Sequence, residues 1–502
     1  MSIVPLLLVL APTLAQARED TQSPGDGLAA LAERVRSETL DNGLRVVVLP
    51  RDGAPTASFR VYVQAGAMDE ARGLTGLAHF AEHMAFKGSR RIGSLDWEQE
   101  RVALERCDAA WRAYEEAASG RAAAEAAQVE ALRSAFEKAR AQADALSDAS
   151  AFDRAVEGAG GLDQNATTGA DATQYFVSLP AERLEQWFWL TREQIGAPVF
   201  REFYRERDVV LEERRMRIGS SAAGALREAL LQTAFVAHPY RDPAIGLMDD
   251  LRWLDRAEME AFWASHYGAG RIVIAVVGRV DPEQVFAFAR TYLGDLPRGA
   301  ARPRRTSEPE QEGPRSVTVA RPASPRALLA WQVPPLVGET GLVHDALADL
   351  LAGTRAARLT RALVEEQGVA SRVSASAGYP GRLDPTLFVV EVRPVPGQPL
   401  RELVDLAQQE LDRFAVEGPD ARELSGMKRR LKARLLRSLT SDAGLAAALA
   451  RAEADAGGWQ EVFARVAAIE ALDGEVIRVA AERLRAERRT TAWLRAAGED
   501  GP

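Results

Sequence analysis

The most informative stretch of the chain is Gly73-Leu-Thr-Gly-Leu-Ala-His-Phe-Ala-Glu-His-Met-Ala-Phe-Lys-Gly88, in a sequence of 502 residues with only five histidines. It contains an H-x-x-E-H pattern formed by His79, Glu82 and His83. On a helix, residues four apart project from the same face, so His79 and His83 can offer two imidazole nitrogens to one metal ion. A carboxylate beside that metal can act as general base toward a water whose pKa the metal lowers. The pattern therefore predicts a zinc peptidase site with Glu82 as the base.

The order of these residues is the reverse of H-E-x-x-H and is typical of the inverzincins. The alternative is that two histidines and a glutamate share an exposed helix face by chance. A catalytic zinc site also needs a third protein ligand. The best candidate is Glu213, which lies seven residues after Glu206 and thus two turns along one helix face. Periodicity alone does not separate Glu213 from Glu212, and a helix rich in Glu and Arg can simply be a solvated face.

These two segments together resemble the pitrilysin and mitochondrial processing peptidase family. In that family H-x-x-E-H is followed by E-R-x-x-V-x-x-E, which matches Glu206-Arg-Asp-Val-Val-Leu-Glu-Glu213 here. The resemblance implies that Glu213 is the third zinc ligand and that Glu206 is a supporting acid of the catalytic site. Carboxylates in that outer position orient histidine ligands and tune the metal. The cofactor predicted on this basis is one Zn²⁺ per chain.

A third segment, Gly161-Leu-Asp-Gln-Asn-Ala-Thr-Thr168, resembles the family's G-x-x-x-N-A-x-T motif. The resemblance implies an edge strand beside the zinc, in which Asn165, Ala166 and Thr167 bind an extended substrate backbone by strand addition. Without the family, the segment is a Gly-rich turn that enters a strand. The run His238-Pro-Tyr240 is also similar to a family segment, and we predict a structural role for it.

The same stretch is repeated later in the chain. Gly73 to Gly88 aligns with Gly338-Glu-Thr-Gly-Leu-Val-His-Asp-Ala-Leu-Ala-Asp-Leu-Leu-Ala-Gly353. The second copy keeps a histidine, His344, but has Leu347 and Ala348 where the first copy has Glu82 and His83. It therefore cannot build the same metal site, and we interpret His344 as a packing residue.

This repeat predicts an α+β fold of two related α+β domains, and the 47% hydrophobic content is that of a globular protein. The resemblance implies that two such halves close like a clam around a cavity. The predicted boundaries are 1–17 for a signal peptide, 18–36 for an N-terminal linker, 37–298 for the catalytic domain, 299–314 for a linker rich in Pro, Arg and Glu, and 315–502 for a degenerate copy of the catalytic domain.

Local patterns predict individual elements. In the first half we expect a hairpin around Asn42-Gly43 within 39–49, strands at 58–64, 174–179 and 271–277, and helices at 76–87, 184–194 and 203–217. In the second half we expect strands at 316–320, 328–333 and 386–392, with helices over most of the rest as far as about residue 484.

An Ala-, Glu- and Arg-rich stretch, about 95–153, makes the spacing from His83 to Glu213 longer than is usual in the family. Apolar residues within it have helical spacing, and Ser119-Gly120 interrupts it, so we predict an inserted helical hairpin. It could cover the cavity, face a partner or be a passive solvated hairpin. The single cysteine, Cys107, lies in this insertion, so one chain offers neither a disulfide nor a cysteine metal site.

Active members of the family carry an Arg and a Tyr in the second half that help stabilise the oxyanion. Val364 and Ser371 occupy those two places here. The pattern favours a zinc-bearing subunit that pairs with a homologous Arg/Tyr-bearing subunit as a heterodimer. A self-sufficient enzyme or a homodimer stays open, because Arg361 or Arg372 could substitute in a shifted register.

The start of the chain bears on localisation. An apolar run at 3–14 followed by Ala15-Gln-Ala17 indicates a signal peptide, although no Lys or Arg precedes it. We therefore expect a periplasmic or secreted protein without a membrane span. A net charge of −9 argues against nucleic acid as a partner.

Three hypotheses follow for the function. The first is a zinc metalloendopeptidase that cleaves peptides or unfolded protein segments. The second is a zinc-bearing subunit that is silent without its partner, and the third is a non-catalytic peptide-binding or scaffold homologue. His79, Glu82, His83 and Glu213 favour the first two, because a scaffold does not need all four.

Overall fold

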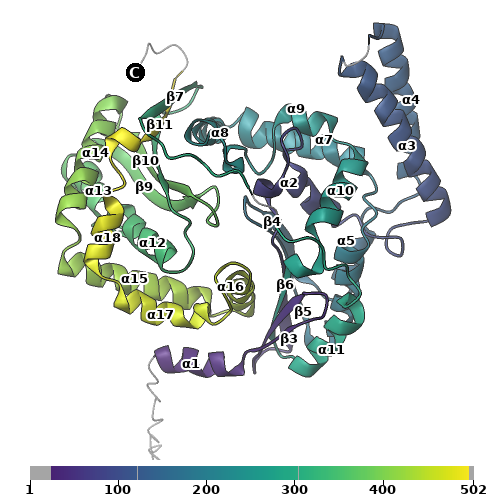
Figure 1. The fold of residues 1–502 in the computed structure, drawn as a ribbon, viewed down its shortest axis with the longest axis horizontal. Helices are drawn as coiled ribbons and strands as arrows, with labels where there is room; N and C mark the ends of the chain where they lie inside the picture. The colour runs from purple at the N-terminus through teal and green to yellow at the C-terminus, as the bar shows by residue number, and fades with distance from the viewer. Residues whose placement is uncertain (1–23, 121–122, 303–304, 497–502) are drawn as a thin grey trace, which may run out of the picture.

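The structure is a computed structural model that describes residues 24–120, 123–302 and 305–496. It consists of two α+β halves joined by an extended segment (Figure 1). The predicted fold class is confirmed, since each half contains one sheet covered by helices. The predicted signal peptide at 1–17 lies outside the described residues.

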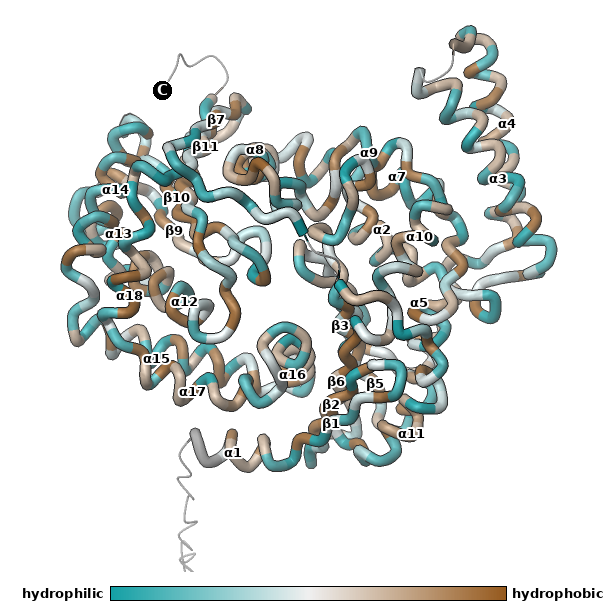
Figure 2. Tube along the Cα trace, viewed as in Figure 1, coloured by the Kyte–Doolittle hydropathy of each residue, from teal (hydrophilic) through white to brown (hydrophobic). Residues whose placement is uncertain are grey.

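The first sheet has the strand order β1-β2-β6-β3-β5-β4. Its strands are β1 (Arg36–Thr39), β2 (Arg45–Pro50), β3 (Thr56–Val63), β4 (Leu162–Thr168), β5 (Thr173–Pro180) and β6 (Ile272–Gly278). Every residue of β6 is buried, as expected for the all-apolar run Ile-Val-Ile-Ala-Val-Val-Gly in the middle of a sheet covered on both faces. Figure 2 shows the hydrophobic residues concentrated along these central strands. Strand β4 lies at the edge.

The second sheet has the order β7-β11-β8-β10-β9. Its strands are β7 (Arg315–Ala320), β8 (Arg326–Val333), β9 (Ala370–Tyr379), β10 (Thr386–Pro394) and β11 (Thr490–Arg495). β7 pairs parallel with β11 and all other neighbours are antiparallel, which repeats the pattern of β2, β6, β3, β5 and β4. The internal repeat of the sequence is thus a repeat of topology, and β9 is the counterpart of the edge strand β4.

The helices of the first half are α1 (Pro24–Arg34), α2 (Leu77–Met84), α3 (Trp97–Ala118), α4 (Ala126–Asp144), α5 (Ala151–Gly158), α6 (Leu184–Thr191), α7 (Phe203–Arg214), α8 (Ala222–Ala234), α9 (Met248–Trp253), α10 (Arg256–His266) and α11 (Pro282–Leu293). Those of the second half are α12 (Gly338–Ala352), α13 (Arg358–Thr360), α14 (Leu400–Glu417), α15 (Ala421–Ser438), α16 (Asp442–Asp455), α17 (Glu461–Ala471) and α18 (Gly474–Ala481).

The helix predicted at 76–87 is shorter than expected at both ends. Gly76 has φ +94° and precedes α2 as its N-cap, since this left-handed conformation suits glycine. After Met84 the chain turns toward Gly88, which has φ +80°. The helices predicted at 184–194 and 203–217 are present as α6 and α7, and each ends in a π-helical turn, at Arg192–Gly196 and Arg215–Gly219.

The two halves exchange one helix each. Helix α8, from the first half, packs on strands β7, β8 and β11 of the second sheet, where Leu230 and Leu231 meet Leu328 and Leu494. Helix α16, from the second half, packs on β3 and β6 of the first sheet. Figure 1 shows α16 between the second half and the first sheet. Because each core is completed by the other half, we expect the halves to unfold together.

Helices α3 and α4 form an antiparallel pair that projects from the first half (Figure 1). The pair is anchored in the core from its base as far as Trp111 and Phe136. There Trp111 and Phe136 pack against Tyr204 of α7, with ring centroids 5.1 and 5.2 Å away, and Arg207 lies 3.8 Å from the Trp111 ring centroid. Cys107 is buried at this base, where burial raises the pKa of its thiol to about 12.

A buried ion pair ties the insertion to the segment after α2. Arg201 and Glu100 have side chains 1% and 0% exposed and are joined by a 2.7 Å contact from Nε to Oε1. The Arg201 guanidinium also donates to the backbone carbonyls of Lys87, Ser89 and Ile92, each at 2.7 Å. Arg201 therefore fixes the loop that continues the H-x-x-E-H helix.

Replacing Arg201 with Met should lower the free energy of unfolding by about 3–5 kcal/mol, because Glu100 would be left as an unpaired buried charge. Urea unfolding followed by circular dichroism measures the effect. The double variant Arg201→Met/Glu100→Leu should recover part of this loss but not all of it, since the three carbonyls stay unpaired. Equal stability of the single and double variants would show that the two charges are not coupled.

Candidate metal centre

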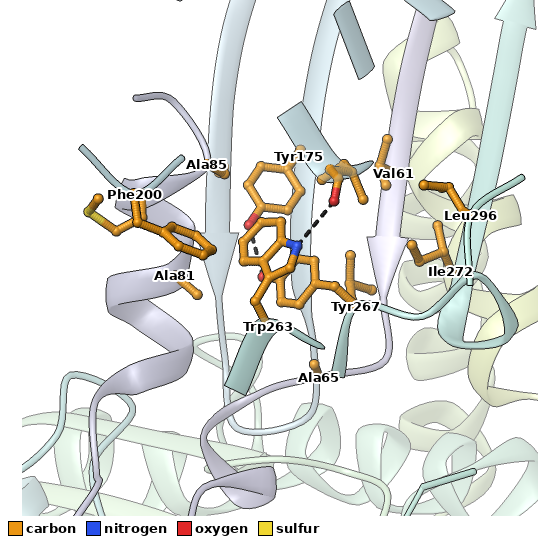
Figure 3. Close-up of a cluster of buried hydrophobic side chains, with 14 of the residues drawn as sticks. Val61, Ala65, Ala81, Ala85, Tyr175, Phe200, Trp263, Tyr267, Ile272 and Leu296 are labelled. Carbon is orange, nitrogen blue, oxygen red and sulfur yellow. Dashed lines mark hydrogen bonds between the residues drawn. The ribbon is translucent and has the colours of Figure 1, made fainter. Parts of the chain in front are cut away.

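Helix α2 presents two different faces. Ala81 and Ala85, with Phe80 and Met84, are buried in the main core of the first half. Figure 3 shows Ala81 and Ala85 beside Phe200, Trp263 and Tyr267, where the Tyr175 and Tyr267 hydroxyls lie 2.9 Å apart. The rigid packing of one face fixes the direction of the other, which carries His79 and His83.

The structure brings His79, His83 and Glu213 together. One potential ligand atom from each lies within 4.8 Å of the others. Glu213 Oε2 is 3.6 Å from Nε2 of His79 and 3.5 Å from Nε2 of His83. For metal–ligand bonds of about 2.0–2.2 Å, two ligand atoms at a tetrahedral zinc are separated by roughly 3.3–3.6 Å. The two distances from Glu213 Oε2 to the histidines fit that separation.

The remaining contacts of Glu213 also fit a metal. Its Oε1 forms an ion pair with Arg217 at 2.7 Å. Its Oε2 is buried and has no hydrogen-bond partner in the described structure. A buried carboxylate oxygen without a partner is costly. Burial also lowers the pKa of His79 to about 3, so its ring is neutral and can offer a nitrogen lone pair to a metal. A cation bound among these three atoms would satisfy all of them, and the two-imidazole, one-carboxylate set suits Zn²⁺.

Glu206 lies on the far side of His83. Its Oε1 accepts a 2.8 Å hydrogen bond from His83 Nδ1, which leaves Nε2 facing Glu213. Lys87 Nζ is 2.6 Å from Glu206 Oε2. Burial opposes ionisation of Glu206, but the hydrogen bonds from His83 and Lys87 hold its pKa at about 2. Burial likewise opposes charge on His83, and the hydrogen bond to Glu206 outweighs it and raises the His83 pKa.

Glu82 projects beside these residues. The Thr168 hydroxyl donates a short hydrogen bond to Glu82 Oε2 and lies 3.3 Å from the Thr173 hydroxyl. Burial raises the pKa of Glu82, although the Thr168 hydrogen bond acts in the opposite direction. A carboxylate whose pKa is shifted toward neutrality is suited to accept and return a proton.

Strand β4 brings Asn165, Ala166 and Thr167 next to α2. Ala166 is buried, whereas Asn165 and Thr167 are exposed. One side of β4 pairs with β5, and its other side has no neighbouring strand in the sheet. The backbone groups on that free edge are available for an added strand.

The second half has no equivalent of this arrangement among the described residues. His344 donates from Nδ1 to the Thr340 carbonyl at 2.8 Å. Asp349 of α12 instead pairs with Arg430 and Arg434 of α15, at 2.6 and 3.1 Å. By order along the chain, α12 and α15 correspond to α2 and α7. Ion pairs therefore join the two helices whose counterparts in the first copy carry the candidate metal ligands.

Val364 and Ser371 do not supply catalytic groups. Val364 packs against the second core, and the Ser371 hydroxyl donates to the carbonyls of Arg393 and Pro394 at 3.2 and 3.1 Å. Arg361 lies 3.6 Å from Glu366, and Arg372 is exposed on β9. His238 is buried and accepts from the Tyr240 backbone N–H at 3.1 Å, which is a structural contact.

Comparison with known proteins identifies the family. The "Insulinase (Peptidase family M16)" model matches residues 46–136 and the "Peptidase M16 inactive domain" model matches residues 254–431, together more than half of the chain. The chain belongs to peptidase family M16. The resemblance drawn from the sequence is thereby confirmed. The match in the second half covers the copy that has Leu347 and Ala348 in place of Glu82 and His83.

Similarity to individual proteins agrees with this family assignment. The chain is 27% identical to the zinc protease PqqE of Helicobacter pylori over 67% of this chain and 65% of that protein. The chain thus spans about two thirds of the length of the curated relatives that it matches. A protease structure from Helicobacter pylori superimposes with a TM-score of 0.75 and 24% identity, covering 92% of this chain and 99% of that one.

A larger protein shares the fold over part of its length. The periplasmic protease PqqL of Escherichia coli matches with a TM-score of 0.67 and 19% identity, covering 92% of this M16 chain but 48% of PqqL. At this identity the likeness concerns the fold alone.

No helix within the described part of the M16 chain has the length and apolar character needed to cross a bilayer.

Two residues of the M16 site escaped the sequence analysis. Thr168 is the last residue of the G-x-x-x-N-A-x-T motif, but the sequence did not predict its contact with Glu82. Lys87 was not singled out at all. Its position four residues after His83 could have suggested it, since it then lies on the same helix face.

The metal ligands can be tested by zinc stoichiometry. Glu213→Gln should lose bound zinc, because an amide is a poor substitute for the carboxylate among two imidazoles. Glu212→Gln is the matched control, since Glu212 pairs with Arg215 at the surface and should keep one zinc per chain. Both are measured by metal analysis after dialysis. Loss of zinc in Glu212→Gln with retention in Glu213→Gln would contradict the assignment.

Glu206→Gln should weaken zinc binding about 10–100-fold, as loss of a supporting carboxylate does at other sites. Competition with a chelating indicator measures the affinity. Glu202→Gln is the control, since Glu202 lies 3.8 Å from Lys87 without a hydrogen bond to His83. Equal affinity in the two variants would remove the supporting role of Glu206.

Proposed function

We propose that this chain is a zinc-dependent metalloendopeptidase that hydrolyses peptides or unfolded protein segments. The observation that carries the proposal is that His79 and His83 lie close to the unpartnered Oε2 of Glu213, with Glu82 beside them. Membership of family M16 and similarity to the zinc protease PqqE support it. His79, His83 and Glu213 would hold the zinc ion.

Zinc, when bound, supplies Lewis acidity that activates water and polarises a carbonyl group. Glu82 then accepts a proton from the attacking water as the water oxygen bonds to the carbonyl carbon. It returns that proton to the amide nitrogen as the C–N bond breaks. The Thr168 hydroxyl holds Glu82 in place through its hydrogen bond to Oε2.

The substrate would bind as an added strand on the free edge of β4. An extended backbone there can exchange hydrogen bonds with the strand, independently of its side chains. Asn165, Ala166 and Thr167 are the residues proposed to bind it. This mode favours unfolded or flexible segments, because a folded substrate already uses its own backbone groups.

A second candidate is a zinc-bearing subunit that needs a homologous Arg/Tyr-bearing partner. The observation that favours it is that Val364 is apolar and packs against the second core, and that the Ser371 hydroxyl donates to backbone carbonyls. These two positions therefore offer neither a guanidinium nor a phenol to a substrate carbonyl. The partner would complete the stabilisation of the oxyanion. A homodimer is the alternative assembly, and a non-catalytic peptide-binding homologue is the alternative without chemistry.

We further propose a periplasmic or secreted location. The predicted signal peptide carries this proposal, and the relative PqqL is described as a periplasmic protease.

Glu82→Gln should lower kcat for quenched fluorescent peptides by about 10²–10⁴-fold, since it removes the general base. It should keep one zinc ion, because Glu82 is not one of the three ligands. Hydrolysis by the zinc-loaded wild-type chain that disappears in this variant would establish a self-sufficient peptidase. Activity that is unchanged in the variant would rule out Glu82 as the base.

If the zinc-loaded wild-type chain is inactive alone, addition of the homologous subunit should restore hydrolysis, and Glu82→Gln should abolish it again. Absence of activity in both cases, despite stoichiometric zinc, would favour the non-catalytic homologue.

A further inference from the structure

The two histidines of the candidate metal centre are held in different ways. His83 donates from Nδ1 to the Glu206 carboxylate at 2.8 Å, which orients its ring. The corresponding Nδ1 of His79 is buried and has no hydrogen-bond partner within the described part of the chain. Metal-binding histidines usually have such a partner on the second ring nitrogen. The position of His79 therefore depends on how the backbone of α2 is held.

The N-terminus of α2 has no capping side chain of its own. Its N-cap residue is Gly76, with φ +94°. A Cβ atom on Gly76 would lie 2.6 Å from Cδ2 of Leu251 and 2.9 Å from the carbonyl oxygen of Ile245. A serine, threonine or aspartate would therefore not fit at this position without a shift of its neighbours. The first N–H groups of a helix have no partner within the helix, so their acceptors must come from elsewhere.

Glu70 supplies these acceptors from outside the helix. Its Oε2 accepts from the Gly76 N–H at 2.8 Å, and its Oε1 accepts from the Ala78 N–H at 2.7 Å. One carboxylate thus binds two backbone groups of the first turn, and the second of them directly precedes His79. A negative charge at a helix N-terminus is also favourable for the helix dipole.

The turn that carries Glu70 is itself firmly held. The side chain of the preceding residue, Asp69, is 0% exposed and accepts from the Gly66 N–H at 3.0 Å. Asp69 also forms ion pairs with Arg271 at 3.1 Å and with Arg302 at 2.7 Å. Arg302 belongs to the segment between the two halves. Glu70 therefore projects from a backbone that is fixed by contacts on several sides.

We propose that Glu70 is the positioning residue for His79, in the way that Glu206 supports His83. This inference rests on the proposed function, because it assigns a further residue to the same metal centre. Glu70 acts through the backbone of α2 and touches neither the metal ligands nor the substrate. Ligands of a metal site must be held to within about 0.5 Å of the productive geometry, so a shift of the first turn of α2 would weaken zinc binding.

The test measures the metal site without any need for turnover. Zinc affinity is measured by competition with a chelating indicator, and the coordination geometry is followed by the visible absorption spectrum of the Co²⁺-substituted chain. Glu70→Gln keeps one acceptor oxygen but places an NH₂ group against the other backbone N–H. We expect it to weaken zinc binding about tenfold, and Glu70→Ala, which removes both acceptors, to weaken it about 100-fold. Both variants should change the Co²⁺ spectrum.

Asp420→Asn is the matched control. The Asp420 carboxylate accepts from the N–H groups of Arg422 and Glu423 at 2.7 and 2.8 Å, at the start of α15 in the second half. This variant should unfold at a lower urea concentration than the wild type, but it should keep the wild-type zinc affinity and Co²⁺ spectrum. A general loss of stability is thereby separated from an effect on the metal site.

Zinc affinity and a Co²⁺ spectrum that stay at wild-type values in Glu70→Gln and Glu70→Ala would overturn the inference. Changes of the same size in Asp420→Asn would overturn it as well. If Glu70→Ala does not fold, Glu70→Gln decides the outcome alone, because it has the volume of the native side chain and keeps one of the two acceptors.

The outcome is separable from that of the proposed function. A wild-type chain that cleaves peptides, with Glu70 variants that bind zinc normally, would leave the peptidase standing and refute the role of Glu70. A wild-type chain that binds zinc but cleaves nothing alone or with a partner, with weakened zinc binding in the Glu70 variants, would refute the peptidase and support the role of Glu70. Absence of zinc binding in the wild-type chain would refute both.

Discussion

The packing of α2 against α7 is the constraint on which the rest of the structure depends. Phe80 and Phe203 meet across this interface with ring centroids 4.6 Å apart, inside the main core of the first half. Because both helices are held rigidly on their buried faces, their other faces bring two imidazoles and a carboxylate to one point. The Arg201–Glu100 pair holds the loop after α2, and the contacts of Glu206 and Thr168 hold His83 and Glu82. The site thus consists of side chains whose positions the core determines.

The sequence predicted this region well because the chemistry is local. His79, Glu82 and His83 are within one helical turn and a half, so their spacing alone carries the geometry. Glu213 was different, since helical periodicity could not separate it from Glu212. Only the long-range packing of α7 does so, by turning Glu213 toward the histidines and Glu212 toward Arg215 at the surface. The family motif supplied that choice in advance, and the distances agree with it.

Other features could not be read from the sequence. The strand β9 was not predicted, because Ala370–Tyr379 is an edge strand in which most residues are exposed or half-buried and no clear apolar alternation is present. β11 was not predicted either, since Thr490–Arg495 follows a long helical region and pairs with distant partners. The exchange of α8 and α16 between the halves depends on tertiary packing alone.

The second half shows how the repeat has diverged. Its sheet keeps the topology of the first, but ion pairs from Asp349 to α15 join the helices that correspond to the metal-binding pair. Helix α16 of this half completes a core of the first half by packing on β3 and β6. The second copy therefore contributes structure, and its described residues form no equivalent of the His79, His83 and Glu213 cluster.

The most direct test of the account is an anomalous diffraction map recorded at the zinc edge from crystals of the zinc-loaded chain. The account predicts one strong peak in the first half, about 2.0–2.2 Å from Nε2 of His79, Nε2 of His83 and Oε2 of Glu213. A peak elsewhere, or a fully loaded crystal with no peak among these three atoms, would contradict it.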